Sequence, residues 1–338
     1  MGPLLPDDGP VGPRLLRRAR GIIAESLLLL LVTVLMPALL LVAAVVDLAL
    51  WLARRKPWMA VRLTLFLWWF LAGELRGILT LLVLWLRAAG RDTPSRRRGV
   101  YRLRQSWAAG HIAGVRVLFG LRFEVEGLED AGPGPVVILI RHASIIDNML
   151  PDTLVGRAHD LGLRFVLKRE LQMIPTIDIG GRWVPTVFVR RGSGDTEAEL
   201  ARLRRVAEDL GPDEGILIYP EGTRHTDAKL VRAKAVIAER QPDIAPLAEG
   251  LRHVLPPRLG GPLALLEATR GTDVVLCGHV GLDGFEYISD VWGGGLVGTT
   301  VKVRFWRFDG ASVPEGRDEL TRWLYARWQT LDDWIDAA

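Results

Sequence analysis

The chain opens with two long apolar stretches and then changes to short apolar runs separated by turns. Residues 26–46 are 21 residues without a charge. As a helix they would extend about 30 Å, the thickness of the hydrocarbon layer of a bilayer. The second stretch, residues 63–86, is interrupted by Glu74 and Arg76, which favours an interfacial or partly buried helix. Together they predict a membrane-embedded helical hairpin within residues 1–98.

The flanks of this hairpin are basic and aromatic. Trp51, Trp58 and Trp85 lie near the ends of the stretches, where an indole ring can rest in the headgroup layer. Basic clusters before, between and after the stretches leave only a small margin in favour of cytoplasmic termini. Both a spanning hairpin and one that dips into a single leaflet, bent at Pro37, fit the sequence. We expect the cytoplasmic membrane as the location, with the part of the chain that follows the hairpin on its cytoplasmic face.

The remainder, residues 99–338, alternates β-branched runs, amphipathic stretches and Gly/Pro turns, which is typical of an α/β domain. Helical connections make consecutive strands parallel, so we expect a mostly parallel twisted sheet flanked by helices. The predicted strands cover residues 122–126, 136–140, 164–167, 186–189, 215–219, 274–280 and 300–306. The predicted helices cover residues 144–156, 195–210, 228–239, 262–269 and 317–335.

Polar groups follow four successive predicted strands. Because parallel strands end at the same edge of a sheet, these groups should gather where open α/β sheets bind ligands. Loops are polar in general, so any one position could be accidental, yet three of the four groups carry cations. The sequence therefore predicts a basic pocket around a histidine. The groups are His142, Lys168 with Arg169, Arg190 with Arg191, and Glu221 to Arg224.

Composition narrows the class of protein. An apolar fraction of 49% suffices for a sizeable core, and most of the net charge of +4 lies beside the apolar stretches, where it suits anionic headgroups. No zinc spacing, aromatic-basic platform or recognition helix accompanies the arginines, so no nucleic-acid partner is expected. The single cysteine, Cys277, excludes an internal disulfide and a cysteine metal cluster. It lies in an apolar run, as a buried hydrophobic residue would.

The run from Arg141 to Asp147 carries the candidate base. His142 follows a predicted buried strand, and Asp147, five residues later, could bond one ring nitrogen and fix the tautomer. Such a pair can deprotonate a hydroxyl that attacks an activated acyl carbon, without an enzyme nucleophile. A competing interpretation is a capping box, in which Ser144 caps a helix and Asp147 reaches back to it. Capping leaves His142 unexplained.

The alternatives to this base are less well supported. Ser144 is the rival nucleophile, yet no G-x-S-x-G elbow surrounds it, so we expect a cap or a hydroxyl donor. No metal is required. The other histidines lack metal-ligand spacing and are expected to be structural or surface groups: His111, His159, His225, His253 and His279.

A second motif, Tyr219-Pro220-Glu221-Gly222-Thr223-Arg224, follows the predicted strand at 215–219. Pro220 ends the strand, Gly222 permits a tight turn, and Arg224 can then present its guanidinium to a phosphate. Glu221 could hold that arginine or bind a substrate hydroxyl. A string this short carries little information alone, and its position downstream of His142 strengthens it.

His142-x4-Asp147 and Glu221-Gly222-Thr223-Arg224 resemble the first and third sequence blocks of the glycerolipid acyltransferase family, which includes 1-acylglycerol-3-phosphate acyltransferases. Phe188-Val189-Arg190-Arg191 resembles the second block, and the match implies that Arg191 binds the acceptor. The run from His253 to Arg258 resembles the proline-containing fourth block, which implies that Pro257 lies on the acyl side. The likeness extends roughly from Val136 to Asp333. The family's attachment by an N-terminal helical pair agrees with the predicted hairpin.

The resemblance implies transfer of a fatty acyl group from an acyl thioester, acyl-CoA or an acyl carrier protein, to the free hydroxyl of a lysophospholipid in the membrane. The acceptor expected first is 1-acylglycerol-3-phosphate, which would give phosphatidic acid. Glycerol-3-phosphate and larger lysolipids are alternatives. His142 would be the general base and Asp147 its orienting partner, with no cofactor and no covalent intermediate. The residues expected to bind the acceptor are Lys168, Arg191, Glu221, Gly222, Thr223 and Arg224.

Two other hypotheses stay open on the sequence. One is a membrane protein that binds lipid without turnover. The other is an esterase that uses the same pair to activate water, which would release free fatty acid without an acceptor.

Overall fold

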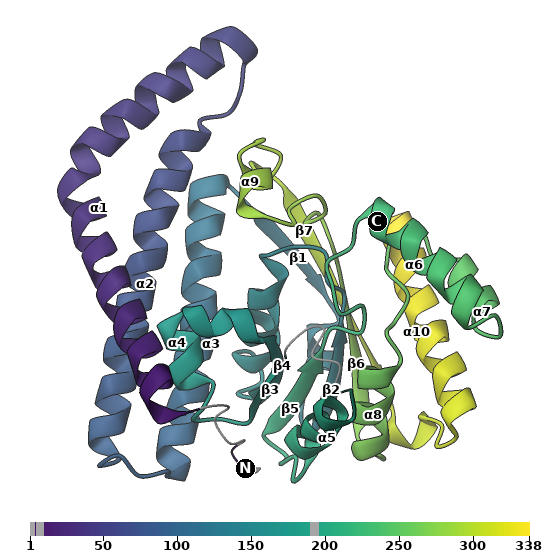
Figure 1. The fold of residues 1–338 in the computed structure, drawn as a ribbon. Coiled ribbons are helices and arrows are strands. Elements are labelled where there is room, and N and C mark those ends of the chain that lie inside the picture. The colour runs from purple at the N-terminus through teal and green to yellow at the C-terminus, as the bar shows by residue number, and fades with distance from the viewer. Residues whose placement is uncertain (1–3, 5–9, 190–195) are drawn as a thin grey trace.

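The computed structural model describes Leu4, residues 10–189 and residues 196–338. Within this part of the chain, seven strands form one sheet in the order β1-β7-β6-β2-β5-β3-β4 (Figure 1). Neighbouring strands run parallel except β6 and β7, which confirms the predicted, mostly parallel sheet. The strands are β1 (Arg122–Glu126), β2 (Val136–Ile140), β3 (Gly162–Lys168), β4 (Thr186–Val189), β5 (Glu214–Ile218), β6 (Asp273–Val280) and β7 (Thr300–Phe308).

The central strands are the most apolar ones. Every residue of β2 and of β5 is buried, as strands covered on both faces require. Successive side chains of β2 enter different cores. Ile138 packs in one core with Phe119 and Leu150, and Leu139 packs in a second core with Trp328. The carboxyl end of β2, where the candidate base lies, is therefore held from both sides.

Helices cover both faces of the sheet (Figure 1). The first four helices lie on one side in that view, and helices α5, α8 and α10 lie on the other. The helices are α1 (Val11–Arg54), α2 (Met59–Arg87), α3 (Pro94–Phe119), α4 (Pro175–Gly180), α5 (Thr196–Ala207), α6 (Asp227–Arg240), α7 (Ala245–Glu249), α8 (Gly260–Ala268), α9 (Ile288–Val291) and α10 (Arg317–Ala337).

The predicted helix at residues 144–156 is wrong. This segment forms a 3-10 turn (Asp147–Met149) followed by a π-helical turn (Pro151–Gly156). In a regular helix the carbonyl of Asp147 would accept from residue 151, but Pro151 has no N–H to give. That carbonyl instead accepts from the N–H of Leu150, in the 3-10 turn, and from the hydroxyl of Tyr219 at 3.4 Å. The irregular backbone is thus part of the site rather than an ordinary helix start.

Helix α3 has no counterpart among the predicted helices. Its sequence begins with arginines that the sequence analysis assigned to a basic flank. Thr93 caps the helix by accepting from the N–H of Arg96 at 3.2 Å, and Pro94 occupies its first turn. The predicted domain division between residues 98 and 99 falls inside this helix.

Helices α1 and α2 form the predicted N-terminal pair, and each is long and apolar enough to cross a membrane by length and composition. Asp47 of α1 is fully buried and accepts from the backbone N–H groups of Met59 (3.0 Å), Ala60 (2.9 Å) and Val61 (2.9 Å). It therefore caps the start of α2. Both ends of α2 pack into the domain, because Met59 belongs to the sheet core and Leu81 packs against α3.

The contact between α2 and α3 contains a histidine in an apolar environment. His111 packs against Phe70 and Trp107, with ring centroids 5.0 and 4.5 Å away. Both of its ring nitrogens are buried without a hydrogen-bond partner among the described residues. Burial, reinforced by Arg76, lowers the pKa of His111 to about 4.

This histidine should make the stability of the protein depend on pH. The unfolded chain binds a proton near pH 6.5, whereas folded His111 resists it down to about pH 4. The free energy of unfolding should therefore fall as the pH drops from 6.5 to 4, by about 3 kcal/mol at most. In His111→Phe this component should be absent when denaturant unfolding is followed over that range. Equal pH dependence in the two proteins would contradict the assignment.

Candidate active site

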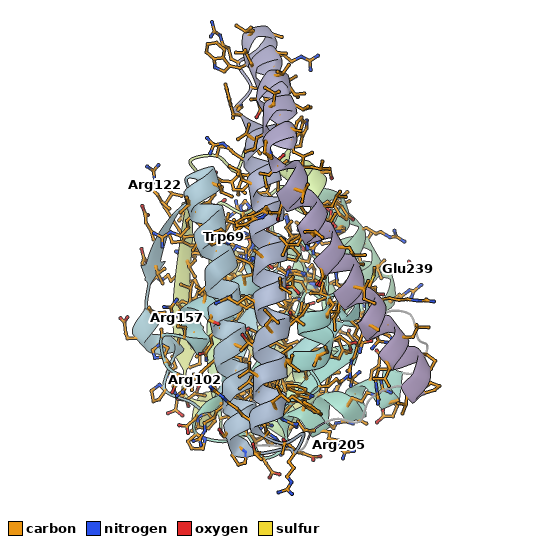
Figure 2. The ribbon with its side chains drawn as sticks, turned by 90° about the vertical axis from the view of Figure 1, so that its left-hand side faces the viewer. Trp69, Arg102, Arg122, Arg157, Arg205 and Glu239 are labelled. Carbon is orange, nitrogen blue, oxygen red and sulfur yellow. The ribbon has the colours of Figure 1, made fainter. Side chains whose placement is uncertain are left out.

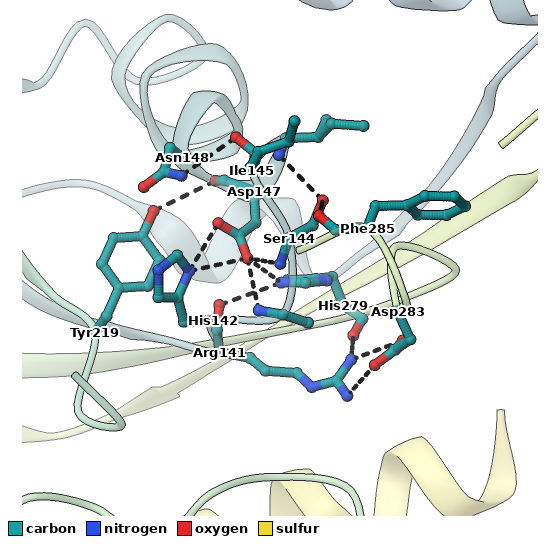
Figure 3. Close-up of polar contacts among 12 residues, drawn as sticks. Arg141, His142, Ser144, Ile145, Asp147, Asn148, Tyr219, His279, Asp283 and Phe285 are labelled. Atoms are coloured by element: carbon teal, nitrogen blue, oxygen red, sulfur yellow. Dashed lines mark hydrogen bonds and ion pairs between the residues drawn. The ribbon is translucent and has the colours of Figure 1, made fainter. Parts of the chain in front are cut away.

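His142 and Asp147 form a buried pair at the carboxyl end of β2 (Figure 3). His142 Nδ1 lies 3.0 Å from Asp147 Oδ1 and 3.2 Å from Oδ2. The histidine side chain is 6% exposed and the aspartate side chain 0%. An ionised carboxylate can only accept, so Nδ1 carries a proton, and in the neutral ring Nε2 is the nitrogen with a free lone pair. No described residue hydrogen-bonds Nε2, which leaves this atom for a substrate.

Asp147 is surrounded by donors. Its Oδ2 accepts from the backbone N–H groups of Ala143 at 2.7 Å and Ser144 at 2.8 Å. Burial opposes its charge, but the interactions with His142 and His279 outweigh burial and hold the pKa of Asp147 well below its usual range. The carboxylate is therefore ionised near neutral pH, and backbone contacts fix its position.

His279 is a member of the site that sequence reasoning missed. It lies on β6 and is fully buried, with Nε2 3.2 Å from the carbonyl of Arg141 and 3.6 Å from Asp147 Oδ2. A carbonyl can only accept, so Nε2 carries a proton. Its Nδ1 is buried without a partner among the described residues. Asp147 thus lies between two imidazoles (Figure 3).

The capping interpretation is half right. Ser144 Oγ accepts from the N–H of Ile146 at 3.1 Å and donates to the carbonyl of Phe285 at 3.2 Å, so it does not bond residue 147 as a capping box requires. The reach-back half is present, because Asp147 accepts from the N–H of Ser144. Asp147 therefore stabilises the turn and orients His142 at the same time. Ser144 is fully buried and its hydroxyl is engaged as donor and acceptor.

The turn from Glu221 to Arg224 lies beside the histidine, because β5 pairs with β2. The Tyr219 ring packs against the His142 ring, with centroids 4.5 Å apart and the ring planes tilted by 44°. Glu221 Oε2 accepts from the backbone N–H of His142 at 3.2 Å, and the N–H of His225 donates to the His142 carbonyl at 2.8 Å. Burial raises the pKa of Glu221 well above its usual range. Glu221 thus contacts the backbone of the base directly.

The rest of this turn connects to the loop after β6. Gly222 has a φ of 63°, a conformation that favours glycine. This agrees with the tight turn that the sequence predicted at this residue. Arg224 donates from Nη1 to the carbonyl of Glu286, whose carboxylate pairs with Lys229. The Nε of Arg224 is buried without a partner among the described residues. Arg224 is therefore already held in place on one side of its guanidinium.

The other predicted site residues are spread around this edge of the sheet. Lys168 ends β3 opposite Val189 of β4. Arg191 lies outside the described residues. Pro257 is buried and, with Glu221 and Thr223, lines a groove of about 720 Å³. His142 does not line this groove.

Arg141 is a second residue whose role the sequence did not reveal. It is 1% exposed and donates to the carbonyls of His279 (2.7 Å) and His253 (2.8 Å), and it forms an ion pair with Asp283. Arg141, the residue before His142, thus binds both the segment at His253 and the segment from His279 to Asp283.

The described residues contain no group of three or more His, Cys, Asp or Glu side chains arranged to hold a metal ion. Cys277 is buried in β6, as the sequence predicted, and burial raises the pKa of its thiol.

The fold and the site define an α/β domain with a buried histidine–aspartate pair at the carboxyl edge of its sheet, and residues 122–248 match the model of the Acyltransferase family. Mouse 1-acyl-sn-glycerol-3-phosphate acyltransferase epsilon is 26% identical over 209 residues, 58% of this chain and 56% of the relative. Lyso-ornithine lipid O-acyltransferase from Pseudomonas aeruginosa is 33% identical over 138 residues, 40% of this chain and 46% of the relative. The chain spans about half the length of these curated relatives.

A solved structure is also similar. The crystal structure of the 1-acyl-sn-glycerophosphate (LPA) acyltransferase PlsC from Thermotoga maritima matches with a TM-score of 0.47 and 17% identity, covering 78% of this chain and 97% of that chain.

Proposed function

We propose that this protein is a lysophospholipid acyltransferase that moves a fatty acyl group from an acyl thioester to the free hydroxyl of 1-acylglycerol-3-phosphate. The observation that carries the proposal is the buried contact between His142 Nδ1 and Asp147, which makes Nε2 the nitrogen that can accept a proton in the neutral ring. The family of residues 122–248 and the names of the relatives support the class of reaction.

The pair would work as a general base. His142 Nε2 takes the proton of the acceptor hydroxyl while that oxygen attacks the thioester carbonyl. Collapse of the adduct breaks the carbon–sulfur bond, and the departing thiolate receives the proton from Nε2. Asp147 stabilises the imidazolium that forms in between and keeps the ring oriented. Binding both substrates side by side supplies the remaining rate enhancement.

The acceptor phosphate would be bound by cations at the carboxyl edge. Lys168 and Arg224 come from neighbouring strand ends, and Arg191 follows β4 in the sequence. Glu221, Gly222 and Thr223 would shape the turn that presents Arg224. Arg224 is suited to this role because its guanidinium is pre-positioned by Glu286.

An acceptor panel tests the proposal. Purified protein in vesicles receives one labelled acyl-CoA together with 1-acylglycerol-3-phosphate, glycerol-3-phosphate, a lyso-ornithine lipid or no acceptor. We expect the fastest labelling with 1-acylglycerol-3-phosphate. Preference for another acceptor would overturn the acceptor assignment, free fatty acid without an acceptor would indicate the esterase, and binding without turnover would indicate the lipid-binding protein.

The helical pair would attach the enzyme to one leaflet rather than span the bilayer. The loop between α1 and α2 touches the domain, since Lys56 lies 4.0 Å from the centroid of the Trp292 ring. Asp178 of α4 is clasped near the start of α1 by Arg17 and Arg18, at 2.9 and 3.0 Å. Both ends of the pair are therefore held on the same body. We propose the cytoplasmic face of the cytoplasmic membrane as its location.

The part of α1 that would enter the leaflet is the exposed apolar surface after its Pro37. Leu41 and Val45 of α1 are 67% and 61% exposed. Changing both to aspartate should lower binding to anionic vesicles by more than about 100-fold, because buried apolar area is lost and charge is added. Flotation measures this, and Met173→Asp, at a position that is also highly exposed (76%), is the control. Undiminished flotation of the double variant would contradict the attachment.

A further inference from the structure

A groove of about 720 Å³ opens beside the candidate site, between α6 and the segment 255–260. Its volume lies in the range of small-molecule sites. One end is formed by Glu221 and Thr223, and Glu221 contacts the backbone of His142 at 3.2 Å. Leu255 and Pro256, both buried, provide an apolar wall. A ligand in this groove would therefore approach the base from the α6 side.

The α6 wall is a single helical face. Its lining residues follow the spacing i, i+3, i+4, i+7, i+8 and i+11, which places them on one side of a helix: Lys229, Arg232, Ala233, Val236, Ile237 and Arg240. Such a face normally packs against the rest of a domain. Here Val236 is 41% exposed, because the groove separates it from the opposite wall.

The groove is rich in cations that lack acidic partners. No ion pair involves Arg232, Arg240 or Arg258 within residues 10–189 and 196–338, whereas Lys229 pairs with Glu286. Glu221 is the one acidic residue among the described lining, and it is buried against the His142 backbone. Unpaired arginines beside an apolar wall favour a ligand that joins anionic groups to an uncharged arm.

We propose that this groove binds the nucleotide end of the acyl-CoA donor, with its phosphates on Arg232, Arg240 and Arg258 and its pantetheine arm along the apolar wall toward Glu221. Arg232 and Arg240 are eight residues apart, or about 12 Å along a helix. The single phosphate of a lysophospholipid would meet one of them, whereas the 5′-diphosphate and 3′-phosphate of CoA can meet several. This assignment rests on the proposed function for the choice of a thioester donor.

The test compares two donors that carry the same acyl chain. In the double variant Arg232→Gln with Arg240→Gln, KM for palmitoyl-CoA should rise by roughly tenfold for each arginine, the loss expected for a charge-assisted hydrogen bond. KM for the palmitoyl thioester of N-acetylcysteamine, which has no phosphate, should not rise in parallel. Arg157→Gln is the matched control, because Arg157 is exposed on the side of the molecule seen in Figure 2. Its KM for palmitoyl-CoA should equal that of the wild type.

A direct titration of CoA, without an acyl group, separates this proposal from the proposed function. The wild-type protein in detergent micelles should bind CoA at least tenfold more tightly than the double variant, whether or not any acceptor is turned over. Equal CoA affinities, equal rises in KM for both thioesters, or activity confined to acyl carrier protein thioesters would each overturn the proposal.

Discussion

Replacing His142 with alanine is expected to lower the rate constant of acyl transfer by roughly 10²–10⁴-fold, the usual contribution of a general base. Asp147 holds Nδ1 at 3.0 Å, so Nε2 points away from the carboxylate. No described residue hydrogen-bonds Nε2, and therefore none is in place to accept the substrate proton when the ring is removed. His279 is bonded to the Arg141 carbonyl and fully buried, which keeps it from acting as a substitute. Loss of the ring should therefore remove chemistry and leave substrate binding largely intact.

The measurement is single-turnover formation of labelled phospholipid by purified wild type and variant in the same vesicles. Folding is checked by thermal unfolding, since removal of the ring also removes its contact with Tyr219. His253→Ala serves as the control, because His253 is partly exposed and bonded to Asp336 at 3.0 Å. A His142→Ala protein that retains a near-wild-type rate would end the assignment of the base.

Replacing Asp147 with alanine should be costly to both stability and activity. The N–H groups of Ala143 and Ser144 lose their common acceptor, and each unsatisfied buried donor costs about 1–3 kcal/mol. Asp147→Asn should recover part of this stability, because its amide oxygen can still accept. Its NH2 group would then face Nδ1 or the backbone donors, so the histidine tautomer should be lost and the rate should stay low.

These variants separate orientation from structure. Thermal unfolding should show the highest stability for the wild type, an intermediate stability for Asp147→Asn and the lowest for Asp147→Ala. The transfer rate should be low in both variants. The depressed pKa of Asp147 adds a pH criterion. Its contribution to the free energy of unfolding is present above about pH 4 and is lost as the pH falls toward its folded pKa. Wild-type activity of Asp147→Asn, or loss of the Asp147 stabilisation already between pH 5 and 7, would contradict this role.

The sheet could be predicted because its strands are short apolar runs, and such runs are typical of strands buried inside a sheet. Val136–Ile140 and Thr186–Val189 have the predicted bounds, and their order along the chain required parallel pairing. The pairing in turn brought the Glu221 turn beside His142. The pair of N-terminal helices followed equally from the length of its apolar stretches.

The features that the sequence did not predict depend on contacts between residues that are far apart along the chain. The turn after His142 departs from a helix because Pro151 has no N–H, and the Asp147 carbonyl accepts from Leu150 and from Tyr219, the residue that follows β5. His279 entered the site through the pairing of β6 with β2, which no spacing indicates. Arg141 had no role assigned from the sequence, yet it is buried and donates to the carbonyls of His279 and His253.

The most direct test follows the label of a radioactive acyl-CoA given to the purified wild-type protein, with and without 1-acylglycerol-3-phosphate. We expect labelled phosphatidic acid when the acceptor is present, and neither labelled protein nor labelled free fatty acid when it is absent. Stoichiometric label on the protein, or rapid release of fatty acid without an acceptor, would show that His142 does not activate the acceptor hydroxyl directly.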